Sequence, residues 1–141
     1  MNRDEIMEIL PHRNDMLLID EAIRTGENNA LGAYTVRGDE WFLNGHFPGN
    51  PVVPGVILCE IMAQACAVIL AEKIKGSTPY FSTLDKAKFR RKVVPGDRLE
   101  IDCQVTGNRS VFFFAKASAR VGGEMAASAE FSFAVIREGE N

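Results

Sequence analysis

Apolar and polar residues alternate through most of the last third of the chain. Residues 99–106 alternate strictly, and residues 110–121 and 125–135 repeat the same period of two. This period is typical of β-strands that bury one face. Gly107-Asn108 and Gly122-Gly123 separate these segments and indicate turns, the second with the form of a two-residue hairpin loop. The pattern therefore predicts consecutive antiparallel strands joined by short loops.

One segment in the middle of the chain, residues 56–71, has the opposite character. Its apolar residues cover nearly the whole circumference of a helix, which is typical of a buried helix. Pro54 suits the first helical turn, and the glycine and proline within residues 75–79 form a stop signal. Two polar residues, Glu60 and Gln64, interrupt the segment one turn apart on the same helix face.

The remaining segments predict smaller elements. Residues 3–10 form an amphipathic pattern that ends before Pro11, which predicts a short helix. The apolar residues 16–19 indicate the start of a strand, and residues 30–36 a second strand that pairs with the first as a hairpin. Residues 80–94 alternate in part and predict one more strand.

A long apolar helix in so short a chain is covered only if a sheet wraps around it. Small residues on the inner face of two predicted strands leave room for that helix: Ala115, Ala117, Ala119, Ala127 and Ala129. Phe112 and Phe114 point to the opposite face, which indicates surface buried against a partner subunit. We expect an α+β fold, an antiparallel sheet around one central helix, in a single domain of residues 1–141.

Composition narrows the class of protein. The chain has 141 residues, of which 46% are hydrophobic, enough for one domain with a core. Its net charge of −3 argues against general nucleic-acid binding. No apolar run reaches the roughly 20 residues of a membrane span, and the N-terminus lacks the layout of a signal peptide, so we expect a cytoplasmic protein. The three cysteines have no metal-binding spacing; we expect them to be buried filler, with no metal or cofactor.

The loop before the long helix carries the first sign of chemistry. Residues 46–55 contain three prolines and two glycines, so the loop is stiff, and it begins with His46, one of two histidines in the chain. A carboxylate at Glu60 costs free energy in an apolar helix unless it is paired, hydrogen-bonded or protonated. Taken alone, a loop histidine is more often structural, and Glu60 could pair with a buried cation.

The same stretch carries a family resemblance. The sequence His46-Phe-Pro-Gly-Asn-Pro-Val-Val-Pro-Gly-Val56, followed by Glu60-Ile-Met-Ala-Gln-Ala65, closely resembles the FabZ-type 3-hydroxyacyl-[acyl-carrier-protein] dehydratases of bacterial type II fatty acid synthesis. Further similar segments extend it over nearly the whole chain: residues 10–13, 17–20, 84–90 and 94–97. Asn14 and Asp15 depart from the family's usual pattern.

The resemblance implies a hot-dog fold, in which an antiparallel sheet wraps a central helix. It implies homodimers with two active sites at the interface, often assembled as trimers of dimers. His46 of a site would come from one subunit and Glu60 from the other. The implied substrate is a 3-hydroxyacyl chain on acyl carrier protein.

The residues suit this reaction chemically. Dehydration removes an α-proton next to a thioester and expels a β-hydroxyl group, so it needs a base, an acid and donors for the carbonyl oxygen. Neutral His46 is suited to be the base, and Glu60, in surroundings that raise a carboxyl pKa, to be the acid. The helix N-terminus at Gly55 and Val56 offers N–H donors. Gln64 is suited to orient Glu60 or a water molecule.

A basic run stands out in this acidic chain and comprises Lys86, Lys88, Arg90, Arg91 and Lys92. It fits either a solvated strand edge that resists aggregation or a dock for the acidic acyl carrier protein. Tyr80 and Phe81 are candidates to line or gate the tunnel for the acyl chain.

Two other classes of function remain open from the sequence. Hot-dog proteins include acyl thioesterases, which direct a water molecule with a carboxylate, and a non-catalytic acyl-binding module is a further alternative. Within the dehydratases, a related family that also isomerises the double bond typically has aspartate at the position of Glu60, which favours simple dehydration here.

Overall fold

The computed structural model describes residues 2–9, 17–43, 51–73 and 77–137. Its helices are α1 (Arg3–Ile9) and α2 (Gly55–Lys73), with a short 3-10 turn at Trp41–Leu43. Its strands are β1 (Glu21–Arg24), β2 (Asn29–Thr35), β3 (Ser77–Phe89), β4 (Arg98–Arg109), β5 (Phe112–Val121) and β6 (Glu124–Arg137).

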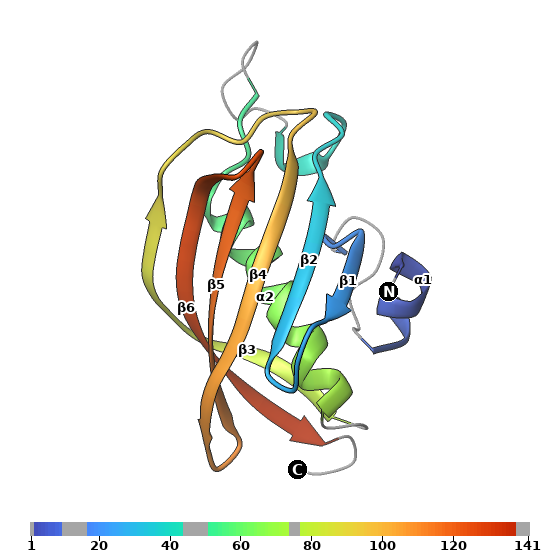
Figure 1. Ribbon diagram of the computed structural model, residues 1–141, viewed down its shortest axis with the longest axis vertical. Coiled ribbons are helices and arrows are strands. Elements are labelled where there is room, and N and C mark those ends of the chain that lie inside the picture. Colours follow the sequence, from blue (N-terminus) through green and yellow to red (C-terminus); the bar gives the residue numbers. More distant parts are fainter. Residues whose placement is uncertain (1, 10–16, 44–50, 74–76, 138–141) are drawn as a thin grey trace.

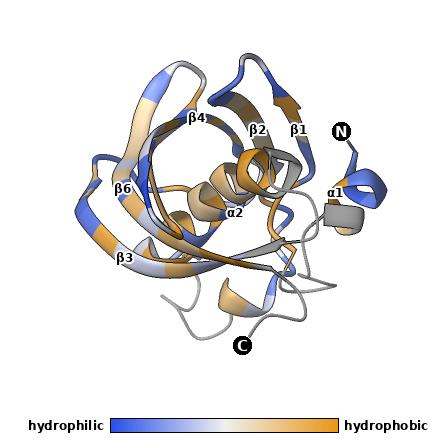
Figure 2. Cartoon of the chain, turned by 90° about the horizontal axis from the view of Figure 1, so that it is seen from below, coloured by the Kyte–Doolittle hydropathy of each residue, from blue (hydrophilic) through white to orange (hydrophobic). Residues whose placement is uncertain are grey.

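The strands form one sheet that curls around α2. Their order is β1-β2-β4-β5-β6-β3, and every neighbouring pair is antiparallel. Figure 1 shows α2 lying along the inner side of this sheet, with α1 beside β1 at one end. In the view from below, the sheet surrounds the helix on several sides (Figure 2). The sequence prediction of an α+β fold with a sheet around one helix is therefore confirmed.

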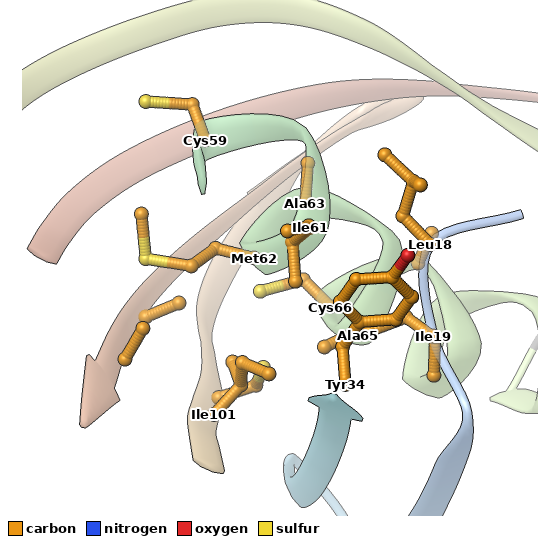
Figure 3. Packing of buried hydrophobic residues seen from close by; sticks show 14 of the residues in the cluster. Leu18, Ile19, Tyr34, Cys59, Ile61, Met62, Ala63, Ala65, Cys66 and Ile101 are labelled. Carbon is orange, nitrogen blue, oxygen red and sulfur yellow. The ribbon is translucent and has the colours of Figure 1, made fainter. Parts of the chain in front are cut away.

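The core lies between α2 and the inner face of the sheet. Side chains at 61–70 on α2 are buried, and they meet alternate residues of the strands (Figure 3). The helix approaches β2 closely, because a Cβ built on Gly32 would lie 3.2 Å from Cβ of Ala65. The alanines of β5 and β6 are buried beneath the helix as predicted, which is why the helix can pack so near the sheet.

Several expected boundaries are wrong. The apolar residues 17–19 are buried but precede the sheet, since β1 begins only at Glu21. Gly107-Asn108 is not a turn: β4 continues to Arg109, and the pairing with β5 shifts register between Val105 and Gly107. Glycine inside a strand commonly marks such a bulge. The chain instead reverses at residues 110–111, where Ser110 adopts a left-handed φ of 56°.

Two valines are more exposed than their apolar segments suggest. Val56, in the first turn of α2, is 75% exposed, because the covering of the helix begins at Leu58. Val111 is 48% exposed, since it belongs to the turn before β5 rather than to the strand's inner face. The hairpin at Gly122-Gly123 is confirmed; both glycines have positive φ, of 57° and 84°, as a primed turn requires.

The edge strand β3 presents apolar side chains to solvent in the single chain. Four large residues of this strand are each at least 41% exposed: Tyr80, Phe81, Leu84 and Phe89. Phe112 and Phe114, on the outer face of β5, are both 43% exposed. Among the described helices, none combines the length and the apolar character needed to cross a membrane.

Candidate active site

The carboxyl group of Glu60 is held on α2 by a buried amide. Nε2 of Gln64 donates a hydrogen bond to Oε1 of Glu60 over 3.1 Å. Oε1 of Gln64 in turn accepts a hydrogen bond from the backbone N–H of Leu18 over 2.8 Å. Gln64 is only 1% exposed, whereas Glu60 is half-buried. Glu60 is thus a carboxyl group in an apolar helix, and its Oε1 is held by the Gln64 amide.

The N-terminus of α2 is built by the segment that leads into it. The backbone N–H of Val53 donates to the carbonyl of Val93 over 2.8 Å, which ties this segment to the residues that follow β3. The carbonyl of Pro54 accepts from Ile57 and Leu58, at 2.9 and 3.1 Å, and so closes the first helical turn. Proline here loses no helical hydrogen bond, because the first N–H groups of a helix have no partner within it.

A cavity of about 450 Å³ opens beside this helix terminus. It is lined by Gly55, Leu58, Phe89 and residues 90–93, among others. The ring of Phe89 lies over Gly55 so closely that an added Cβ would sit 3.0 Å from it. The absence of a side chain at Gly55 therefore allows the aromatic ring to lie this close to the helix terminus.

The structure divides the basic run between two places. Arg90, Arg91 and Lys92 line the cavity beside Gly55. Lys86 and Lys88 instead line a groove of about 480 Å³ on the outer face of the sheet, a groove that Arg90 also borders.

Arg91 has a structural role as well as its place in the run. Its guanidinium lies 3.2 Å from Oε2 of Glu124 and 3.6 Å from Oδ2 of Asp97. Lys86 pairs with Glu130 at 3.2 Å. Charge at these two positions is thus partly balanced by carboxylates of the same chain.

Tyr80 and Phe81 point to opposite faces of β3. Phe81 packs edge-on against Phe131, with ring centroids 5.4 Å apart, and lies 5.8 Å from Phe133. Tyr80 pairs with Ala134 of β6 and is 55% exposed. Only Phe81 therefore lies on the inner side of the sheet, where a tunnel along α2 would run.

His46 lies outside the described residues. The nearest described residues are Leu43 and Pro51. Leu43 ends a turn closed by its N–H, which donates to the carbonyl of Glu40 over 3.1 Å.

Glu40 is a buried carboxylate that the sequence analysis missed. It is 7% exposed and accepts hydrogen bonds from Tyr34 Oη (2.7 Å), the Arg37 N–H (2.9 Å) and the Gly38 N–H (2.7 Å). Burial opposes its ionisation, but these donors outweigh burial and lower the pKa of Glu40. Burial and the bond to Glu40 raise the pKa of Tyr34. A glutamate beside Asp39 and Trp41 resembles any surface acid, so no sequence signal marks it.

The cysteines are buried, as expected. Burial raises the pKa of the Cys59 thiol, and a hydrogen bond with Cys66 together with burial raises that of Cys103. Thiols in this state are poor nucleophiles. In the described parts of the chain, no three His, Cys, Asp or Glu side chains cluster as metal ligands would.

Similarity to known proteins establishes the family to which this chain belongs. The model of the FabA-like domain matches residues 10–130 of this chain. The 3-hydroxyacyl-[acyl-carrier-protein] dehydratase FabZ of Clostridium perfringens is 42% identical over 137 residues, covering 96% of this chain and 99% of the relative. The enzyme of the same name from Clostridium botulinum is 44% identical over 135 residues, covering 94% of each.

The chain belongs to the FabZ-type dehydratase family. Solved structures agree on the fold of this FabZ-type chain. The dehydratase heterocomplex ApeI:P from Xenorhabdus doucetiae has a TM-score of 0.79 at 18% identity, covering 96% of this chain and 91% of that one. The PaaI protein of E. coli, from the phenylacetic acid degradation operon, has a TM-score of 0.63 at 20% identity, covering 81% of both. At these identities the likeness concerns the fold alone.

Proposed function

We propose that this protein dehydrates (3R)-3-hydroxyacyl-[acyl-carrier-protein] to trans-2-enoyl-[acyl-carrier-protein] in type II fatty acid synthesis. The observation that carries the proposal is the carboxyl group of Glu60, held by Gln64 within an otherwise apolar helix. A carboxyl group in largely apolar surroundings suits a general acid, because such surroundings favour its protonated form. The names of the Clostridium relatives supply the reaction.

In the proposed mechanism, imidazole of His46 takes the α-proton, and the electron pair of that C–H bond forms the double bond between Cα and Cβ. The bond from Cβ to the hydroxyl oxygen breaks, and Glu60 gives a proton to the leaving oxygen, which departs as water. N–H groups at Gly55 and Val56 stabilise charge on the thioester oxygen during the step. Proton exchange with solvent then removes the proton from the His46 imidazolium and returns one to the Glu60 carboxylate. No metal or cofactor takes part.

The acyl chain and its carrier have separate binding places in this proposal. Acyl carrier protein docks at the basic rim of the 450 Å³ cavity, so that its prosthetic arm reaches Gly55. Docking in this proposal depends more on Arg90, Arg91 and Lys92 than on Lys86 and Lys88. Phe81 borders the acyl tunnel, and Tyr80, on the other face of β3, contributes to subunit contacts instead.

The proposed assembly is a cytoplasmic homodimer of single-domain subunits, joined further as a trimer of dimers. The apolar side chains of the edge strand β3 support a partner at that edge, because edge strands with exposed apolar residues otherwise invite aggregation. His46 of each site comes from the subunit opposite Glu60.

Mass analysis of products tests the function against its alternatives. We expect purified protein, given 3-hydroxyacyl carrier substrates of short and long chain, to form products lighter by one water, still attached to the carrier. Release of the carrier's thiol without an enoyl product would instead identify a thioesterase. Unchanged substrate at all chain lengths would identify an acyl-binding module.

A further inference from the structure

The edge strand β3 carries two bulges where it pairs with β6. One residue of β3 is extra between Phe81 and Thr83, and another between Asp85 and Lys88. Lys86, within the second bulge, adopts a left-handed φ of 52°. Because successive side chains of a strand point to opposite faces, each extra residue reverses which of the following residues face α2.

The two bulges bring three apolar side chains of β3 to the inner side of the sheet. Phe81, Leu84 and Phe89 are separated by odd numbers of positions, so in a regular strand Leu84 would face away from the other two. Their partners on β6 are instead all buried residues of the core: Phe133, Phe131 and Ala127. Residues directly opposite each other share a face of the sheet, so all three side chains lie on the side of α2.

This row of Phe89, Leu84 and Phe81 stays open in the single chain. The three residues are 50%, 41% and 44% exposed, whereas their partners on β6 are at most 3% exposed. The row starts at the helix terminus, because the Phe89 ring lies against Gly55 and lines the cavity beside it. It ends where the Phe81 ring packs edge-on against Phe131, with ring centroids 5.4 Å apart.

We propose that the acyl chain of the substrate lies along this row, and that Leu84 is the residue at which the protein distinguishes long acyl chains from short ones. The inference rests on the proposed dehydration, which places the thioester at the helix terminus beside Phe89. Continuity with the cavity at Gly55 favours the acyl chain as the ligand of the row. A second subunit beside β3 would cover the open side of the row.

The position of Leu84 along the row sets the chain length that reaches it. Its partner Phe131 lies four residues from Ala127, the partner of Phe89, which is about 13 Å along β6 at roughly 3.3 Å per residue. Carbon–carbon bonds are about 1.5 Å long, so a four-carbon acyl chain extends less than about 5 Å and stops before Leu84. A sixteen-carbon chain passes Leu84 and extends toward Phe81.

Leu84→Ala tests the role of this residue in chain-length preference. We expect the ratio of kcat/KM for sixteen-carbon to that for four-carbon 3-hydroxyacyl carrier substrates to fall about tenfold, because only the long chain loses an apolar contact. Leu31→Ala is the matched control, since Leu31 is similarly exposed, at 46%, but lies on β2. It should leave the ratio unchanged. An equal loss at both chain lengths in Leu84→Ala would overturn the inference and assign Leu84 to packing alone.

Photolabelling of the wild-type protein tests the path of the chain without turnover or substitution. A saturated sixteen-carbon acyl chain with a diazirine at its far end, joined to the carrier by a stable amide, should label the tryptic peptide that ends at Lys86 and contains Phe81 and Leu84. The same group on a four-carbon chain should not label that peptide. Labelling outside β3 by the long chain would overturn the proposed path. Wild-type protein that is labelled as expected but forms no enoyl product would refute the proposed dehydration and leave the acyl-binding row standing.

Discussion

At the scale of single residues, Glu40 shows how a carboxylate can serve structure rather than catalysis. Its two oxygens accept from one hydroxyl group and two main-chain N–H groups, and its own carbonyl closes the turn of residues 41–43. That turn is the last described point before the histidine loop. The hydrogen bonds of Glu40 therefore fix the position of the turn at residues 41–43.

The stability of the protein should depend on the ionisation of Glu40. Its pKa is lower in the folded state than the ordinary value of 4.5, so its contribution is fully present above that value and is lost as pH falls through the folded-state pKa. Glu40→Gln places an NH2 group against donors. We expect it to lower the free energy of unfolding at pH 7 by about 1–3 kcal/mol, measured by urea denaturation.

The same comparison at about pH 3 is the control for that prediction. The difference between Glu40→Gln and wild type should shrink there, because below the ordinary pKa of 4.5 the unfolded wild-type chain takes up a proton at this position that the folded protein resists. An equal difference at both pH values would show that packing, not charge, accounts for the effect.

At the scale of elements, the first turn of α2 meets the end of β3 at Gly55. The ring of Phe89 lies so close to position 55 that an added Cβ would force the ring to shift. The close approach also brings the basic residues after β3 to the rim of the same cavity. The helix terminus and the basic residues thus line one cavity, and the missing side chain at Gly55 lets them approach closely.

Gly55→Ala should reduce dehydration without reducing stability. Alanine favours helix over glycine, but its Cβ displaces the Phe89 ring at the helix terminus. We expect kcat/KM to fall about tenfold, since small displacements at a reacting centre are costly. Adding Phe89→Leu should restore part of the activity, with Phe89→Leu alone as control. A double variant as slow as Gly55→Ala would refute the role of the ring.

The division of the basic run gives a test of carrier docking. Arg90→Glu changes a residue that lines the cavity beside Gly55, whereas Lys88→Glu changes one that lines only the outer groove. We expect Arg90→Glu to lower kcat/KM on carrier substrates about tenfold, more than Lys88→Glu, and to affect small thioester mimics little. Added salt should narrow the difference between wild type and Arg90→Glu. Equal losses on carrier and mimic would indicate a damaged fold.

At the scale of the whole molecule, a single chain leaves much apolar surface uncovered. The exposed side chains of β3 lie at the sheet's edge, and Phe112 and Phe114 lie on its outer face. The rest of the described core is well covered, with 0% exposure at Ile61, Cys66 and Leu70. A second copy packed against β3 and the outer face of β5 would cover part of this surface.

Subunit mixing tests whether the active site is shared. Glu60→Gln and His46→Ala are each expected to fold and to lose nearly all activity. Mixing them under conditions of subunit exchange should restore activity, because a hybrid dimer has one site with both lesions and one with neither. Mass spectrometry of differently tagged subunits confirms the exchange. Hybrid dimers without activity would show that both residues of a site come from one chain.

The sequence predicted those parts of the fold that depend on local patterns. Strands β4 to β6 follow from alternation, and α2 from its continuous apolar surface and its flanking signals. The turn expected at Gly107 was wrong, because a glycine can mark a bulge as well as a turn and only cross-strand pairing decides between them. The start of β1 was wrong because residues 17–19 are buried against α2 outside the sheet.

The sequence predicted which residues belong to the candidate site, but only part of how they contact one another. Glu60 and Gln64 share a helix face, so their contact could be inferred from spacing. The contact between Gln64 and Leu18 joins residues far apart in sequence, and the approach of Phe89 to Gly55 depends on how β3 passes the helix. Neither leaves a local signal, so both needed the structure.

The order of strands in the sheet also has a consequence for folding kinetics. β4, β5 and β6 pair through two short turns, whereas β2 reaches β4 across the whole of α2 and β3. Loop closure for the distant pair costs more entropy, so we expect the three-strand meander to form early in folding. Ala117→Gly, within the meander, should then slow folding, while Ala30→Gly, on β2, should mainly speed unfolding in stopped-flow measurements. During synthesis on the ribosome, residues 17–64 would emerge before the meander that nucleates folding. The half of the chain that carries the proposed catalytic residues would therefore fold only after the C-terminal half has been made.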